Sequence, residues 1–147
     1  MKKIAVAALV GILTLPALSV TLANDEPERV TVQHILIAFK GSIPNDQKIT
    51  RSKEDAEKLA LQVFERAKSG EDFAAMVKMY TNDSYPGIYK MTNRGVTPDR
   101  SKQESSRTGM VPAFGNVGFS LEVGGIGLAV YDPATSRYGW HIIKRLE

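Results

Sequence analysis

The first clear hydrophobic pattern in the chain covers residues 29–39. This stretch is rich in β-branched and apolar side chains and is followed by a glycine and a proline, which predicts a strand. Side chains alternate between the two faces of a strand, and both sets here are mainly apolar, so we expect it to lie in the centre of a sheet. His34 shares its predicted face with Val32 and Leu36.

A helical period follows over residues 52–69. Apolar side chains recur at intervals of three and four residues, with Lys and Glu on the opposite face. Ser52 is suited to cap the start of this helix, and Gly70 is suited to end it. A second, shorter helix is expected from about Asp72, with one apolar stripe formed by Phe73, Met76, Val77 and Tyr80. The two helices would cover one face of the sheet.

The second half of the chain predicts shorter elements. Residues 85–93 favour a return to the sheet, whereas residues 94–109 are crowded with charged and hydroxyl side chains and predict a long polar loop. A short helix is expected from about Pro112, and a glycine-rich turn at residues 121–127 precedes two final strands. We place those strands near residues 128–131 and 138–146. This order predicts one α+β domain with a four-stranded antiparallel sheet.

The first residues have a different composition. Lys2 and Lys3 precede an uncharged apolar run to about residue 20, and small residues then lead to Ala23. This pattern is typical of a secretory signal peptide cleaved after Ala23. The alternative is an uncleaved membrane anchor, but the run is short for a membrane span and contains Pro16.

We therefore divide the chain into a signal peptide at residues 1–23, a polar leader at 24–28 and a domain at 29–147. Cleavage would remove two lysines and no acidic residue, lowering the net charge from +3 to +1. With no basic cluster interleaved with aromatic residues, nothing favours binding to nucleic acid. The chain has no cysteine, so neither disulfides nor a lipidated cysteine can hold it. We expect an exported protein, periplasmic or secreted, that is not inserted in a membrane.

The only two histidines, His34 and His141, fall in the first and last predicted strands, and they would be neighbours if those strands pair. Taken alone, they could equally be buried, hydrogen-bonded core residues. Metal binding is not expected, because there is no His-Glu-x-x-His motif and no cysteine. The Gly-x-Ser-x-Gly motif of hydrolases is also absent, and the glycines at 124–127 lack the Lys-Ser/Thr of a phosphate loop.

Five segments, taken together and in order, resemble the parvulin family of peptidyl-prolyl cis/trans isomerases. They correspond to the opening strand, the helix junction, the end of the second helix, the pocket helix and the closing strand of that family. In this chain they are Val32–Ile37, Lys68–Met76, Tyr80–Asp83, Met110–Phe114 and Tyr138–Ile143. The resemblance covers about residues 30–147. It is interrupted at residues 85–91, where Tyr-Pro-Gly-Ile-Tyr-Lys-Met replaces the usual Gly-Gly-x-Leu-Gly stretch.

The resemblance implies roles for six residues. Met110 and Phe114 would enclose the proline ring of a substrate, one helical turn apart if their segment is helical, although both could be ordinary core residues. His34 and His141 would form a hydrogen-bonded pair beneath this pocket. Asp83 would lie near the rotating carbonyl or order the histidine pair.

Two of these assignments depend on the exact alignment. A shift of one residue would put Asn82 in the place of Asp83, and either residue could simply form a local turn. Tyr89 is our candidate for the remaining apolar wall of the pocket. Residues 40–51 lack the adjacent arginines of phosphate-selective parvulins, so a preference for phosphorylated substrates is not expected.

The function that the resemblance implies is isomerisation of X–Pro bonds in exported proteins, assisting their folding, with no covalent intermediate and no cofactor. Its partners would be proline-containing segments of unfolded exported proteins. The alternative is a chaperone module that binds peptides in the same groove without turnover.

Overall fold

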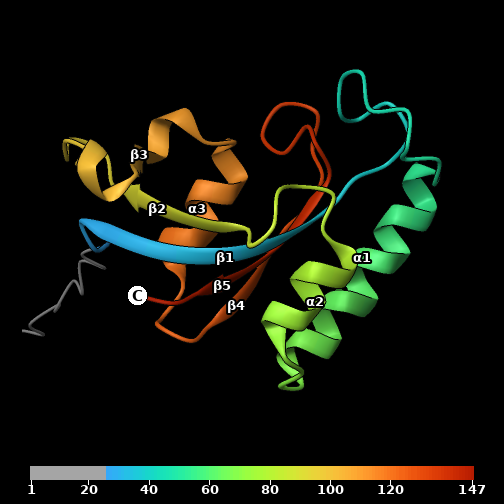
Figure 1. Cartoon of the computed structure of the whole chain (residues 1–147), viewed down its shortest axis with the longest axis horizontal. Helices are drawn as coiled ribbons and strands as arrows, with labels where there is room; N and C mark the ends of the chain where they lie inside the picture. Colours follow the sequence, from blue (N-terminus) through green and yellow to red (C-terminus); the bar gives the residue numbers. More distant parts are fainter. Residues whose placement is uncertain (1–25) are drawn as a thin grey trace, which may run out of the picture.

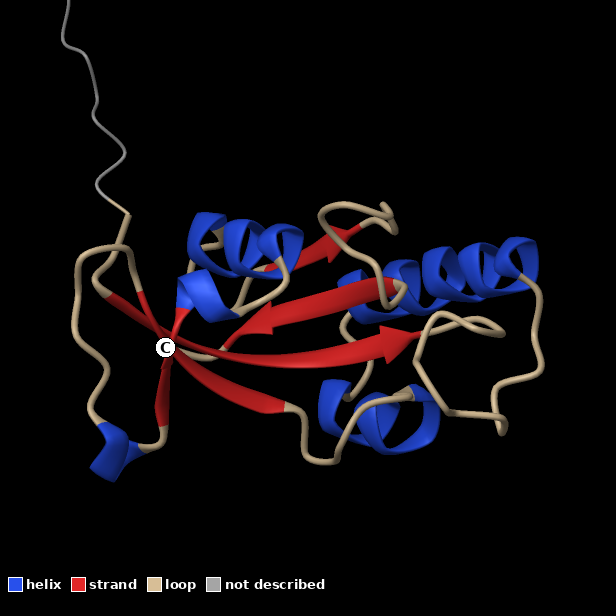
Figure 2. Ribbon diagram, turned by 90° about the horizontal axis from the view of Figure 1, so that it is seen from above, coloured by secondary structure: helices blue, strands red, loops and turns tan. Residues whose placement is uncertain are grey.

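A five-stranded sheet with strand order β3-β2-β1-β5-β4 forms the centre of the molecule (Figure 1). This computed structural model describes residues 26–147, so the predicted signal peptide and the start of the leader lie outside the described residues. Seen from above, the strands fan out with the twist of the sheet (Figure 2). The elements are β1 (Arg29–Ile37), α1 (Lys53–Lys68), α2 (Phe73–Tyr80), β2 (Ile88–Thr92), β3 (Glu104–Ser106), α3 (Pro112–Ser120), β4 (Ile126–Ala129) and β5 (Trp140–Arg145).

Strand β1 lies in the middle of the sheet, as its pattern predicts, and pairs antiparallel with both β2 and β5. Its two sets of side chains enter different cores. Ile35 and Ile37 pack with the buried faces of α1 and α2, whereas Val30 and Val32 pack with α3. Because α3 covers the face that carries Val32, the same face carries His34.

The helix pair forms where the periodicity predicts it. Ser52 caps α1 by accepting a hydrogen bond from the Asp55 amide, and Asp72 caps α2 in the same way through the Ala75 amide. Each side chain satisfies an amide that has no partner within its helix. None of the helices in residues 26–147 has the length and apolar character needed to cross a membrane.

The sequence-based expectation of a plain polar loop at residues 94–109 is wrong. The segment contains two 3₁₀ helices, Arg100–Lys102 and Arg107–Gly109, and β3, which runs parallel to β2 and adds a fifth strand to the four antiparallel ones. The buried Arg107 side chain anchors it by donating to Glu26, Asn93 and Asn116. Glu26 is 81 positions away in the chain, and Asn93 and Asn116 are 14 and 9 positions away, so no helical or strand period reveals these partners.

Candidate active site

The pairing of β1 with β5 brings the two histidines together. His34 lies opposite Ile143 and His141 lies opposite Leu36, so the histidines are diagonal neighbours on one face of the sheet. Their Nδ1 atoms are 3.2 Å apart, and their rings are inclined by only 14°. Both side chains are buried. The structure thus places the predicted pair in direct contact.

The segment that follows α2 is bound to the backbone of β1 and carries the third polar residue of the site. The Asn82 amide donates to the Leu36 carbonyl over 2.8 Å, and Asn82 Oδ1 accepts from the Ala38 amide over 3.0 Å. Asn82 is therefore occupied in holding the segment. Asp83 Oδ2 instead accepts from His34 Nε2 over 2.9 Å and from the Tyr89 hydroxyl over 2.7 Å.

This arrangement determines the charges in the site. The hydrogen bonds from His34 and then Tyr89 hold the pKa of Asp83 well below its usual range, so the carboxylate is ionised at neutral pH. Burial, and then the bond to Asp83, raises the pKa of Tyr89 to about 12, so the phenol keeps its proton. Burial, and then the proximity of His34, lowers the pKa of His141 to about 3, so this ring is neutral.

For the neutral form of the histidine pair, we assign the ring protons from these hydrogen bonds. His34 Nε2–H donates to the ionised Asp83, which leaves a lone pair on His34 Nδ1. His141 Nδ1–H then donates to that lone pair. His141 Nε2 consequently carries a lone pair, and this buried atom has no hydrogen-bond partner among residues 26–147. It is an unused acceptor within the site.

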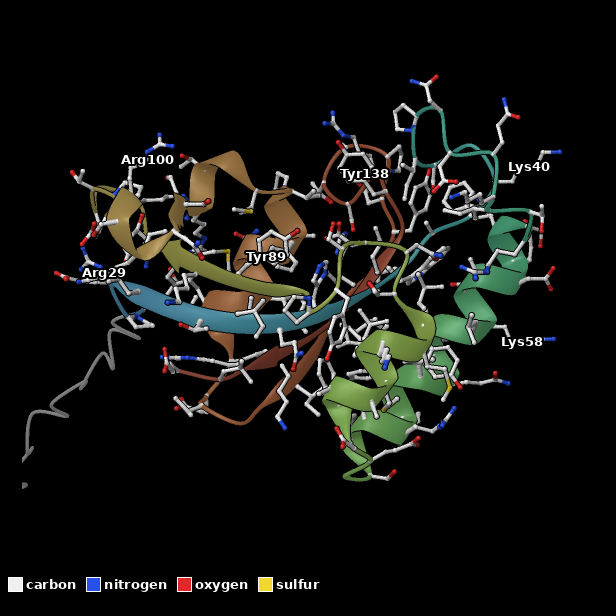
Figure 3. The ribbon with its side chains drawn as sticks, viewed as in Figure 1. Arg29, Lys40, Lys58, Tyr89, Arg100 and Tyr138 are labelled. Carbon is white, nitrogen blue, oxygen red and sulfur yellow. The ribbon has the colours of Figure 1, made fainter. Side chains whose placement is uncertain are left out.

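A cavity of about 420 Å³ lies beside this network, in the size range of small-ligand sites. Three aromatic contacts surround the buried rings: His34 packs edge-on against Tyr89 and Phe114, and Phe114 packs edge-on against His141. Tyr89 projects from β2 and Tyr138 from the connection between β4 and β5 (Figure 3). The cavity is lined by His34, Leu36, Ile43, Pro44, Asp46, Asn82, Asp83, Tyr89, Met110, Val111, Phe114, Tyr138 and His141.

All six predicted site residues line this cavity, but the segment from Met110 to Phe114 is not helical throughout, which was the condition for placing the two residues one helical turn apart. Helix α3 begins at Pro112, and Met110 has an extended backbone just before it. Proline is favoured in the first turn of a helix, which places the start two residues after Met110. Phe114 is only 3% exposed and also belongs to the core around Val32 and Ile143. It is a core residue and a cavity residue at once.

Seven lining residues are not among the six predicted site residues, and four of the seven lie in two connections. Ile43, Pro44 and Asp46 come from the connection between β1 and α1, and Tyr138 comes from the connection between β4 and β5. Nothing in the local pattern distinguishes Ile43, Pro44 and Asp46 from solvated loop residues, whereas Tyr138 was expected to begin the last strand, which in the structure begins at Trp140. Their placement depends on how the two connections lie over the sheet.

Comparison with known proteins identifies the class to which this fold and site belong. Residues 17–147 match the family model of the PPIC-type PPIASE domain. The chain therefore belongs to this family of peptidyl-prolyl cis-trans isomerases, the parvulin class that the ordered motifs indicate.

The chain is similar to Chaperone SurA of Chromohalobacter salexigens, with 34% identity over 114 residues, 77% of this chain and 21% of that protein. It is also similar to Foldase protein PrsA of Caldanaerobacter subterraneus subsp. tengcongensis, with 36% identity over 90 residues, 60% of this chain and 24% of that protein. The chain thus spans about a quarter or less of the length of these two relatives.

Two solved structures share the fold. The solution structure of TbPIN1 superimposes with a TM-score of 0.57 at 23% identity, covering 82% of this chain and 98% of that one. The isomerase ESS1 from Candida albicans gives a TM-score of 0.54 at 21% identity, covering 82% and 63%. The parvulin-like α+β fold predicted from the sequence is confirmed.

Proposed function

We propose that the mature protein isomerises X–Pro bonds of exported polypeptides and so assists their folding, by a mechanism without a covalent intermediate or a cofactor. The observation that carries this proposal is the chain of hydrogen bonds from Tyr89 through Asp83 and His34 to His141, beside a largely apolar cavity. It holds the ionised Asp83 carboxylate beside the cavity through hydrogen bonds from Tyr89 and His34.

The reaction requires rotation about an amide bond with a barrier of about 18–20 kcal/mol. Planarity is stabilised by resonance, which puts partial negative charge on the carbonyl oxygen. A carboxylate close to that oxygen disfavours the charge, so it destabilises the planar amide relative to the twisted one. Asp83, with 30% of its side chain exposed beside the cavity, is in a position to exert this effect.

The other lining residues would bind and position the substrate. Met110, Phe114 and Tyr89 provide an apolar wall for the proline ring, which must stay in place while the preceding carbonyl rotates. His34 and His141 hold Asp83 and exchange no proton with the substrate in this mechanism. Their role is therefore positional and electrostatic.

Two further observations support an exported folding assistant. The N-terminal pattern at residues 1–23 is that of a signal peptide, and the domain would begin after a short leader. The similar proteins from Chromohalobacter and Caldanaerobacter are named a chaperone and a foldase. Slow X–Pro steps can limit folding rates, so such a protein would act on unfolded clients.

The test is exchange NMR on short X–Pro peptides with the purified mature protein, together with refolding of a protein limited by proline isomerisation. We expect the cis/trans exchange rate and the refolding rate both to rise with enzyme concentration. Peptide binding without any increase in exchange would overturn the catalytic proposal and favour the chaperone module. N-terminal sequencing of the exported protein tests cleavage after Ala23 separately.

A further inference from the structure

The cavity contains a carboxylate that the proposed mechanism does not use. Asp46 lies in the connection between β1 and α1 and lines the same cavity as Asp83. Its Oδ1 atom accepts a hydrogen bond from the Lys48 amide over 2.9 Å, which leaves Oδ2 for other partners. Asp46 forms no ion pair within the part of the chain that the structure describes.

The charge of the cavity is therefore one-sided. Among residues 26–147, its lining includes two aspartates and no lysine or arginine. Arg137, in the facing connection, packs its guanidinium over the Tyr138 ring at 4.9 Å and donates to the Tyr138 hydroxyl. It lines an adjoining hollow of about 250 Å³, which shares Met110, Val111 and Tyr138 with the cavity, and does not line the cavity itself.

The position of Asp46 relative to the proline wall suggests which part of a substrate it meets. This step rests on the proposed function. With the ring against Met110 and Phe114, the rotating carbonyl that faces Asp83 belongs to the residue before proline. That residue is one step of about 3.3 Å along an extended chain, so its side chain stays within the cavity. Of the remaining lining residues, we assign Ile43, Pro44 and Asp46, which come from one connection, to this side chain.

This wall matches a long cationic side chain. Lys and Arg pack their methylene stems on apolar surface and keep the charged end near polar groups. Ile43 and Pro44 provide the apolar surface, and Asp46 provides the opposite charge.

We propose that Asp46 selects substrates with Lys or Arg immediately before proline and disfavours those with Asp, Glu or a phosphorylated residue there. The Asp46 carboxylate would attract the basic side chains and repel the acidic ones, and both effects contribute to the preference. Because the pair is partly exposed, each effect is modest and weakened by salt. We expect kcat/KM for Lys-Pro to exceed that for Glu-Pro by about five- to tenfold at low salt.

The decisive variant is Asp46→Asn. An amide oxygen can still accept the hydrogen bond from the Lys48 amide, so the turn is kept and only the charge is lost. The matched control is Glu57→Gln, which removes the same charge from the exposed face of α1, away from the cavity. Both variants are compared with the unmodified mature protein on peptides that differ only in Lys, Ala or Glu before proline.

We expect Asp46→Asn to reduce the Lys/Glu ratio about threefold or more and Glu57→Gln to leave it unchanged. Equal ratios in the unmodified protein and in Asp46→Asn would overturn the assignment. If the Ala-Pro peptide is isomerised without any Lys/Glu preference, the inference fails while the proposed function stands. If no peptide is isomerised, the proposed function fails. The role of Asp46 is then tested on binding alone: the ratio of the dissociation constants of the Lys and Glu peptides should differ between the unmodified protein and Asp46→Asn.

Discussion

His34 and His141 bring their Nδ1 atoms within 3.2 Å of each other although 107 positions separate them in the chain. The contact exists because β1 and β5 are adjacent in the sheet and place both rings on the face covered by α3. His34 also bonds Asp83, so the pair extends to the ionised group at the cavity. The site is thus supported by the centre of the sheet, and the following predictions test how its parts depend on one another.

Loss of the Asp83 charge should reduce catalysis strongly. Hydrogen bonds to charged groups contribute about 1.5–3 kcal/mol, so Asp83→Asn is expected to lower kcat/KM about ten- to a hundredfold. Tyr89→Phe keeps the ring but removes the hydroxyl that donates to Asp83, and it should cost roughly threefold. The control is Tyr85→Phe, because Tyr85 is 60% exposed and lies outside the cavity lining. Full activity in both site variants, measured by exchange NMR, would exclude a catalytic role for this network.

Met110 and Phe114 should respond differently to truncation, because only Phe114 is part of the buried core. Phe114→Ala is expected to lower the free energy of unfolding by about 3–5 kcal/mol, the usual cost of removing a buried aromatic ring. Met110→Ala should cost about 1 kcal/mol of stability or less while raising KM several-fold. Urea denaturation and peptide titrations measure the two effects. A stability loss at Met110 as large as that at Phe114 would show that Met110 serves the core.

Stability should fall as the pH drops below about 6.5. The pKa of His141 is lowered to about 3 in the fold, so between these values the unfolded chain binds a proton that the folded one excludes. Each unit of pH within this window should cost about 1 kcal/mol. Asp83, whose pKa is also lowered, contributes stability that is lost only below the unfolded value of about 3.9.

Denaturation at pH 7, 6 and 5 therefore reports mainly on histidine. Replacing His141 with Leu should make the dependence on pH shallower over this range, even if the variant is less stable at pH 7. An unchanged slope in His141→Leu would mean that burial of this ring does not control the acid sensitivity of the fold.

Two glycines with positive φ provide a test of how closely residue 87 approaches the backbone of β1 at His34. A Cβ at Gly87, whose φ is 68°, would lie 2.6 Å from the His34 carbonyl oxygen, whereas Gly95, at 79°, has open space around it. Gly95→Ala should cost about 1–2 kcal/mol from backbone strain alone. Gly87→Ala should cost clearly more and should displace β1 at His34. Equal losses in thermal unfolding would show that the strand accommodates the methyl group.

How much of the site could be predicted differs from residue to residue. The alternation of β1 was sufficient to place His34 on the face of Val32, and the ordered motifs nominated five residues that line the cavity. Tyr89, the sixth predicted residue, was chosen within the stretch where the resemblance is interrupted. The choice between Asn82 and Asp83 depended on one residue of alignment. It was settled by the hydrogen bonds of Asn82 to the backbone of β1, which leave Asp83 to the histidines.

The sequence by itself determined the elements whose signals are local: the strand at the centre of the sheet and the capped helix pair. Strand and helix periods relate residues that are two to four positions apart, so they are visible in the sequence itself. Only the tertiary structure decided the fifth strand, the burial of Arg107 and the arrival of Asp46 and Tyr138 at the cavity. None of these contacts follows the period of two to four residues that marks a strand or a helix, and a polar residue in a connection has the same local pattern whether it faces solvent or a binding site.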